Sequence, residues 1–360
     1  MINLLHGADL HLGARFRGLP PHKAKQKRQQ QLELLNRLEE LCHRWECDLV
    51  LLSGDLLDRP EGDGEFDGAL ARCLENMKVP VFISPGNHDY VCNRSPYETL
   101  LWPENVHIFK RPVLESVALP ELDIRVWGAG FISMDCPGLL EGFHTSGKEA
   151  WQLLVLHGDP TGPGSPCCPV TRAQAEDAGF HYLALGHIHR GGVLETRSGL
   201  CAWPGCPMGR GFDETGPKGV YHVTLSEDGA RAEFHDLGLG RYEDLTLPAG
   251  DDPMKAIINR LPPDTSRDVY RVTLTGEAED LNPEALEEAL KGRFFDLTLR
   301  DRTELPGDLW ERAGADTLEG LYFRLLRDTA LEAQGQDREI LTLAAKLSRR
   351  ILDGQEVELP

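Results

Sequence analysis

The sequence predicts an α/β fold in which short buried strands alternate with helices. Five apolar runs before residue 190 have the length of buried parallel strands, and helix-like segments separate them: residues 2–8, 48–53, 79–84, 153–156 and 182–185. Each run is followed directly by polar residues. In an open α/β sheet, functional residues lie outside the carboxyl ends of the strands, so we expect the five polar segments to meet at one place.

The polar segments contain the residue types of a metal site. In chain order they are Asp9-Leu-His11, Gly54-Asp-Leu-Leu-Asp-Arg59, Gly86-Asn-His-Asp89, His157-Gly158 and Gly186-His-Ile-His189. Imidazole nitrogens, carboxylates and one amide oxygen, without a thiolate, suit divalent manganese, iron or zinc. The number of candidate ligands predicts two ions, and we expect manganese before iron or zinc.

Asp55 is the predicted bridge between the two ions, because a carboxylate has two oxygens that can bind. The remaining ligands are Asp9, His11 and His189 for the first ion, and Asn87, His157 and His187 for the second. Two ions about 3.5–4 Å apart can activate water and hold both reacting oxygens of a phosphoryl transfer. Two assignments have simpler alternatives: Asn87 also fits an Asx turn after Pro85-Gly86, and His157 also fits a structural histidine.

The ordered series of motifs resembles the calcineurin-like metallophosphoesterases. The segments His6–Gly13 and Trp203–Gly219 resemble the DNA-repair exonuclease branch of that family, which includes SbcD-like and YhaO-like nucleases. The resemblance implies a four-layer α/β/β/α metallophosphoesterase sandwich, with a small C-terminal α+β capping domain and terminal helices. It is strong over about two-thirds of the chain and extends to the rest only in layout.

The resemblance also implies a catalytic pair. His88 would stabilise or protonate the departing oxygen, and Asp58 would hold His88. A carboxylate on one ring nitrogen fixes the tautomer and favours proton donation from the other nitrogen. Archaeal and eukaryotic relatives commonly have a second histidine where this chain has Asp58, which leaves its endonuclease capability open.

The net charge of −20 is unusual for an enzyme that binds DNA. Lys and Arg contacts to phosphates dominate nucleic-acid affinity, so we expect DNA binding through a local basic segment. Residues 10–32 contain no Asp or Glu and six Lys or Arg residues. From that segment we predict phosphate contacts by Arg15 and Arg17, and from the second exonuclease-like segment by Arg210 and Lys218. The run Lys23–Arg28 is equally compatible with a solvated helix face.

The chain divides into three predicted parts: a nuclease domain (1–238), a capping domain (242–305) and a helical hairpin (316–353). Strand-like segments at 193–195, 201–203, 219–225 and 231–236 are expected to complete a second sheet packed on the first. After a Gly-rich linker, the capping domain has a β-α-β-α-β pattern, with Pro253 and Pro283 at the starts of its helices.

The hairpin consists of two amphipathic helices with apolar residues at helical spacing. The simple interpretation is that it covers the capping domain. The alternative is a docking surface, because the resemblance implies a coiled-coil ATPase partner of the SbcC or YhaN type. Relatives of this branch also form homodimers.

Three functions are compatible with the sequence. The favoured one is a metal-dependent DNA exonuclease that acts in DNA repair; the others are a phosphatase or cyclic-nucleotide phosphodiesterase, and a non-catalytic interaction module. Complete ligand positions argue against the last. No apolar run reaches the length of a membrane span, and the nine cysteines are scattered, so we expect a cytoplasmic protein in a reducing compartment. Strand polarity and endonuclease preference stay open.

Overall fold

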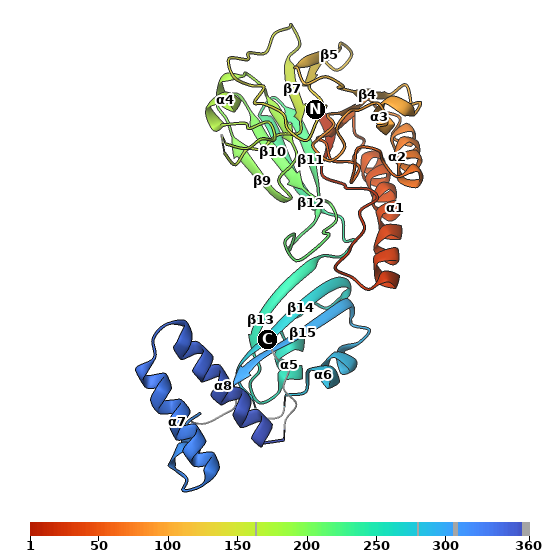
Figure 1. Cartoon of the computed structure of the whole chain (residues 1–360). Helices are drawn as coiled ribbons and strands as arrows, with labels where there is room; N and C mark the ends of the chain where they lie inside the picture. Colours follow the sequence, from red (N-terminus) through yellow and green to blue (C-terminus); the bar gives the residue numbers. More distant parts are fainter. Residues whose placement is uncertain (163, 279–280, 305–308, 355–360) are drawn as a thin grey trace. The chain divides into compact units, whose positions relative to one another are not determined.

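The structure is a computed structural model that describes residues 1–162, 164–278, 281–304 and 309–354. These residues form two compact units (Figure 1). The first unit comprises Met1–Glu243 with Arg267–Val269, and the second comprises Asp244–Ser266 with the described residues from Tyr270 onward. Each unit is described separately below.

Two six-stranded sheets form the centre of the first unit, with strand orders β12-β11-β1-β2-β3-β4 and β5-β6-β7-β8-β10-β9. The first sheet contains β1 (Ile2–Gly7), β2 (Leu49–Leu52), β3 (Val81–Ile83), β4 (Val106–Ile108), β11 (Gly219–Ser226) and β12 (Gly229–Asp236). The second contains β5 (Glu115–Leu119), β6 (Ile124–Gly128), β7 (Trp151–Leu156), β8 (Tyr182–Leu185), β9 (Arg190–Glu195) and β10 (Leu200–Gly205).

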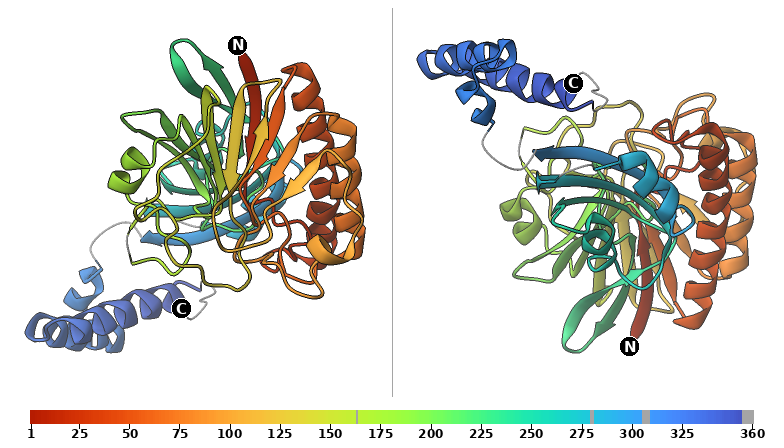
Figure 2. Two further views of the ribbon diagram at one scale, coloured as in Figure 1. Left: turned by 90° about the horizontal axis from the view of Figure 1, so that it is seen from above. Right: turned by 90° about the horizontal axis from the view of Figure 1, so that it is seen from below.

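The two sheets pack face to face between helical layers. Apolar residues of both sheets, such as Leu51 and Val155, form one buried cluster between them. Helices α1 (Pro21–Arg44) and α2 (Gly64–Met77) cover the outer face of the first sheet, and α4 (Arg172–Asp177) lies against the second (Figure 2). The predicted α/β/β/α sandwich is therefore confirmed. A further short helix, α3 (Pro96–Thr99), follows β3.

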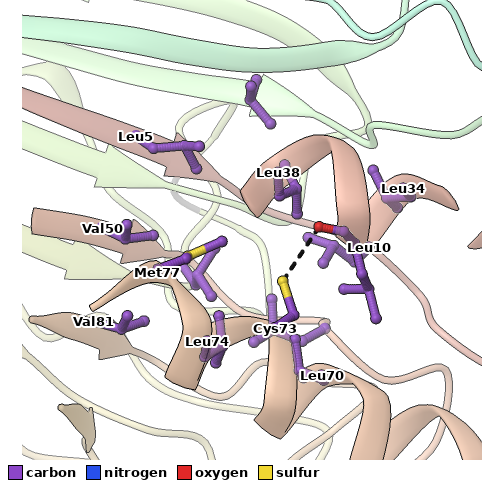
Figure 3. Packing of buried hydrophobic residues seen from close by; sticks show 14 of the residues in the cluster. Leu5, Leu10, Leu34, Leu38, Val50, Leu70, Cys73, Leu74, Met77 and Val81 are labelled. Atoms are coloured by element: carbon purple, nitrogen blue, oxygen red, sulfur yellow. Dashed lines mark hydrogen bonds between the residues drawn. The ribbon is translucent and has the colours of Figure 1, made fainter. Parts of the chain in front are cut away.

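A second buried apolar cluster lies between the first sheet and helices α1 and α2, and it includes Leu10 of the first metal-binding motif. Figure 3 shows Leu34 and Leu38 of α1 close to Leu10, which belongs to the same buried cluster. The Cys73 thiol of α2 donates a hydrogen bond to the carbonyl oxygen of Leu35, at 3.2 Å. Leu10 thus anchors the segment that carries Asp9 and His11 to the helices.

The motif strands do not share one sheet. β1, β2 and β3 pair in parallel in the first sheet, whereas β7 and β8 pair in parallel in the second. The expectation of a single sheet edge was therefore wrong, as was the placement of 219–225 and 231–236 in the second sheet. β11 pairs antiparallel with β1, and β12 with β11, so both extend the first sheet. The motifs still meet, because the two stacked sheets present these strand ends at the same edge.

The second unit begins with a three-stranded sheet in the order β13-β14-β15. Its elements are β13 (Tyr242–Pro248), α5 (Pro253–Ile258), β14 (Thr265–Glu277), α6 (Pro283–Leu290) and β15 (Phe294–Glu304). The side chains of Asp252 and Asn282 cap the two helices by accepting hydrogen bonds from backbone amides. Residues 279, 280 and 305 of the predicted capping domain lie outside the described residues.

The helices α7 (Leu318–Glu332) and α8 (Gln336–Leu352) follow a short 3₁₀ turn, η1 (Glu311–Gly314), in the same unit. They pack on each other through a small core that includes Phe323 and Ala345. Several large apolar side chains of this hairpin remain exposed, and we call them the hairpin apolar surface: Leu318, Leu321, Leu325, Leu331, Ile340 and Ile351. In the described part of the chain, no helix is both long and apolar enough to cross a membrane.

Candidate metal centre

The segments after β1 and β2 run side by side and carry three of the predicted ligands. The amide of Asp9 donates to the carbonyl oxygen of Gly54 at 3.0 Å, and the amide of His11 donates to that of Asp55 at 2.9 Å. Gln31 of α1 holds the end of the first segment, since its side-chain amide donates to the carbonyl oxygen of His11 at 2.8 Å. Each of these ligands is only 1% exposed.

Four of the predicted ligands have a left-handed backbone. The φ angles are 53° at Asp9, 44° at His11, 50° at Asp55 and 83° at His187. Residues with a Cβ atom rarely adopt this conformation. It changes the direction of the chain, so the side chain does not point where it would in a continuing strand. The sharp turns at the strand ends therefore direct these ligands toward one another.

The first cluster brings together Asp9, His11, Asp55 and His189, whose candidate ligand atoms all lie within 4.8 Å of one another. The Nε2 atoms of His11 and His189 are 3.2 Å apart. Among the described residues, Oδ2 of Asp9 is buried without a hydrogen-bond partner. A carboxylate oxygen and two facing imidazole nitrogens that converge in this way fit the ligand set of a divalent cation.

The second cluster is centred on Asn87. Its Oδ1 atom lies 2.9 Å from Nε2 of His157 and 3.1 Å from Nδ1 of His187. Oδ2 of Asp55 lies 3.6 Å from Nε2 of His157 and 3.8 Å from Nε2 of His11. Asp55 therefore stands between the two clusters, where the sequence predicted a bridging carboxylate.

In two histidines of the centre, the ring nitrogen that does not face the other ligands has an oxygen partner. Nδ1 of His157 donates to the carbonyl oxygen of Ser53 at 2.9 Å, which leaves the Nε2 lone pair directed at Asn87. Nδ1 of His189 lies 2.7 Å from Oε1 of Glu214. Such partners fix the tautomer and the ring orientation of a metal-binding histidine. Sequence reasoning missed Ser53 and Glu214, because neither lies in a motif beside its histidine.

Asp89 holds the two loops that carry Asp55 and Asn87. Its fully buried carboxylate accepts hydrogen bonds from the amides of Gly86 and Leu56, both at 2.7 Å, and from the Tyr97 hydroxyl at 2.6 Å. Burial, followed by the nearby charge of Asp55, raises the pKa of Asp89. Asp89 belongs to the predicted Gly-Asn-His-Asp motif, although the sequence assigned it no role.

The glycine of that motif is required by close packing. A Cβ atom on Gly86 would lie 2.3 Å from Oδ1 of Asp55.

Burial by itself favours the neutral form of Asp55, but the neighbouring His157, His11 and His88 together lower its pKa. A lowered pKa favours the ionised carboxylate that a bridging ligand requires.

His88 and Asp58 lie beside the first cluster, and candidate ligand atoms of His11, Asp58 and His88 all lie within 4.8 Å of one another. The amide of His88 donates to Oδ1 of Asp55 at 2.8 Å. Its Nδ1 atom is 3.4 Å from the carbonyl oxygen of Asp58, not from the carboxylate. The Asp58 carboxylate instead lies 3.6 Å from Nδ1 of His11 and 3.5 Å from Nη1 of Arg210.

A groove of about 510 Å³ adjoins these residues, and Arg15, Arg17, Arg59, Asp58 and Arg210 line it. Arg15 and Arg17 are exposed, and neither has an ion-pair partner among the described residues. They remain suitable for phosphate contacts.

The other predicted DNA contacts are placed differently. Arg210 is engaged with Glu214 at 2.6 Å, and Lys218 is only 5% exposed, so its ammonium group is not available to a DNA backbone. Of the basic run, Lys27 is fully buried, while Arg28 donates to the carbonyl oxygen of Gly13 at 2.6 Å. Sequence alone does not reveal which cations of a basic segment are buried.

Comparisons with known proteins identify relatives of the first unit. Residues 2–191 match the calcineurin-like phosphoesterase family, and this segment contains every predicted metal ligand. The uncharacterised metallophosphoesterase YhaO of Bacillus subtilis is 29% identical over 252 residues, covering 66% of this chain and 61% of that protein. The SbcD component of the nuclease SbcCD from Staphylococcus epidermidis is 28% identical over 285 residues, covering 69% and 73%. A dimetal phosphatase from Danio rerio covers 66% of this chain and 96% of its own, with 12% identity and a TM-score of 0.41.

Proposed function

This chain belongs to the calcineurin-like phosphoesterase family, and we propose that it is a DNA nuclease that hydrolyses phosphodiester bonds with two divalent metal ions. The observation that carries the proposal is the position of Asp55 between two ligand clusters. Since the chain spans only 61% of the length of its Bacillus subtilis relative, its substrate and partners are proposals as well.

The residues of the two clusters fit a two-metal site. Asp9, His11, Asp55 and His189 would hold one ion, and Asp55, Asn87, His157 and His187 the other. Two ions bound in this way supply an activated water and hold both reacting oxygens of a phosphoryl transfer. We propose manganese as the ion, with iron and zinc as alternatives that the same nitrogen and oxygen ligands accept.

His88 is the proposed proton donor to the departing oxygen. Its backbone amide is fixed by Asp55, and its ring packs edge-on against His11 with centroids 4.8 Å apart. The imidazole therefore lies beside both ligand clusters but belongs to neither proposed ligand set. The carbonyl oxygen of Asp58, at 3.4 Å from Nδ1, is an acceptor that orients the ring.

The groove supports DNA as the substrate. Three carboxylates, those of Asp58, Asp213 and Glu214, line it together with Arg59 and Arg210. Arg15 and Arg17 supply exposed positive charge in the same groove. In a chain with a net charge of −20, this local positive charge is suited to a phosphate backbone. The Staphylococcus epidermidis relative is, by its name, part of a nuclease.

The hairpin apolar surface supports a partner. Leu318 is 85% exposed and Leu325 61% exposed, in a hairpin whose own core is satisfied by Phe323 and Ala345. We propose that a coiled-coil ATPase docks there and supplies positive surface that this acidic chain lacks. A role in DNA repair follows from such a complex.

The test compares three substrates: a linear duplex, a DNA hairpin and a simple phosphate ester. The protein should cleave DNA with manganese and lose all cleavage with EDTA. Hydrolysis of the ester without cleavage of DNA would instead indicate a phosphatase or a cyclic-nucleotide phosphodiesterase. Absence of hydrolysis on every substrate, despite bound metal, would leave only an interaction module.

A further inference from the structure

Arg210 joins two carboxylates that come from different parts of the first unit. Its Nη2 atom donates to Oε1 of Glu214 at 2.6 Å, its Nε atom donates to the same oxygen at 3.1 Å, and its Nη1 atom lies 3.5 Å from Oδ1 of Asp58. In the sequence, Asp58 follows β2 of the first sheet, and Glu214 lies in the segment that connects β10 of the second sheet to β11. One planar guanidinium can span both groups because its donors form a rigid fork.

Each of these carboxylates lies on the Nδ1 side of a histidine of the first cluster. Oε1 of Glu214 lies 2.7 Å from Nδ1 of His189. Oδ1 of Asp58 lies 3.6 Å from Nδ1 of His11, and that nitrogen is buried and has no hydrogen-bond partner among the described residues. Both rings therefore have a carboxylate near Nδ1 and present Nε2 to each other, at 3.2 Å.

In the second cluster the carboxylates near the corresponding nitrogens are farther away. Nδ1 of His157 donates to a backbone carbonyl oxygen and has Asp9 at 4.0 Å, and Nε2 of His187 has Asp159 at 3.9 Å. The contacts of Arg210, Asp58 and Glu214 thus concern the two histidines of one cluster.

We propose that Arg210 is a positioning residue for the first metal ion. It fixes Asp58 and Glu214 so that His11 and His189 direct Nε2 at the same cation. This assignment rests on the two-metal centre of the proposed function, and it replaces a direct contact between Arg210 and DNA. The side chain is also mostly withdrawn from solvent, with 23% of its surface exposed.

Metal binding by the full-length apoprotein tests the assignment. Manganese titration by calorimetry should show two ions in the unaltered protein. Nη2 of Arg210 also lies 3.1 Å from Nδ1 of His189. Arg210→Gln should therefore weaken the first site by roughly 10–100-fold, the usual effect of removing a group that contacts a metal-binding histidine. The second ion should be affected less. Electron paramagnetic resonance at two equivalents of manganese should show the spin-coupled pair in the unaltered protein and mononuclear manganese in the variant.

Two further variants separate positioning from charge and from general stability. Arg210→Lys keeps the charge but lacks the fork, so it should stay impaired; full recovery of the first site would overturn the proposal. Arg125→Gln removes a comparable Arg–Glu pair, 2.8 Å long and on the second sheet, and should leave both affinities unchanged.

The remaining outcomes are also decisive. Unchanged metal affinity in Arg210→Gln with weaker DNA binding would make Arg210 a phosphate contact and overturn the proposal. Equal loss of both ions with a lower melting temperature in EDTA would show a general structural role and overturn it too. Fewer than two ions in the unaltered protein would contradict the two-metal function itself, which is a different result.

Discussion

Nδ1 of His6 and the hydroxyl group of Tyr182 are 2.8 Å apart and connect the two large sheets through a buried hydrogen bond. His6 belongs to β1 and Tyr182 to β8, and the opposite nitrogen of His6 lies 3.0 Å from Oγ of Ser53. The carbonyl oxygen of Ser53 in turn holds His157. His6 is thus a fully buried link beneath the metal centre.

Burial lowers the pKa of His6 from 6.5 to about 3, which predicts a pH-dependent stability. Between these values the unfolded chain binds a proton that the folded protein excludes. The contribution of the neutral histidine is therefore complete above about pH 6.5 and declines as the pH falls toward 3. Urea unfolding in EDTA should show a free energy of unfolding that falls more steeply in the unaltered protein than in His6→Gln, by up to about 1.4 kcal/mol per pH unit. Parallel curves would contradict the link.

Asp55 should be the ligand whose loss removes both metals. We expect Asp55→Ala to bind neither manganese ion tightly, because its carboxylate lies 3.8 Å from His11 and 3.6 Å from His157. His189→Ala should mainly weaken one ion. Elemental analysis of the purified variants measures this difference, and two ions retained in Asp55→Ala would remove the bridging role.

His88→Asn should keep both metals and lose turnover. The imidazole is absent from the proposed ligand sets, and its backbone contact with Asp55 survives the substitution. General acid catalysis contributes about 10²–10⁴-fold, so kcat should fall within that range while metal content stays constant. A variant with normal hydrolysis would rule out the catalytic role.

Arg15 and Arg17 should act on DNA affinity alone. Their joint replacement by Ala should weaken binding equally for all sequences and reduce the slope of log K against log salt by about 0.9 per lost contact. Hydrolysis of a small phosphate ester should stay nearly constant, because no metal ligand changes. Arg37→Ala, which removes an exposed arginine of α1 paired with Glu40, serves as the charge control. If the slope of log K against log salt equals that of the control, the two arginines do not contact the phosphates and are ordinary solvated surface residues.

The hairpin apolar surface should bind the ATPase. Deleting residues from Asp316 onward should spare manganese-dependent cleavage of short substrates and abolish association with the coiled-coil partner. Leu325→Ser with Ile340→Ser should do the same without removing the helices, since both side chains are more than half exposed. Phe323→Ser, at a fully buried position, should instead lower the melting temperature. Binding retained by the double variant would place the docking surface elsewhere.

The parts of the centre that could be predicted are those encoded locally. Asp9 and His11 are two residues apart after an apolar run, and His187 and His189 repeat that spacing, so their convergence follows from strand ends alone. The division of the strands between two sheets could not be predicted, because a strand buried on both faces has the same apolar composition in either sheet. The contact between Glu214 and His189 joins residues far apart in the sequence and leaves no periodic pattern. The contact between the Asp58 carboxylate and Arg210 likewise joins residues 152 positions apart.

The left-handed backbone at Asp9, His11, Asp55 and His187 limits which substitutions these positions tolerate. Each such residue carries a conformational cost of about 1–3 kcal/mol that the surrounding packing must offset. Glycine at any of these positions would relieve the cost and abolish a ligand. Stability and metal binding therefore make opposite demands on the same four residues.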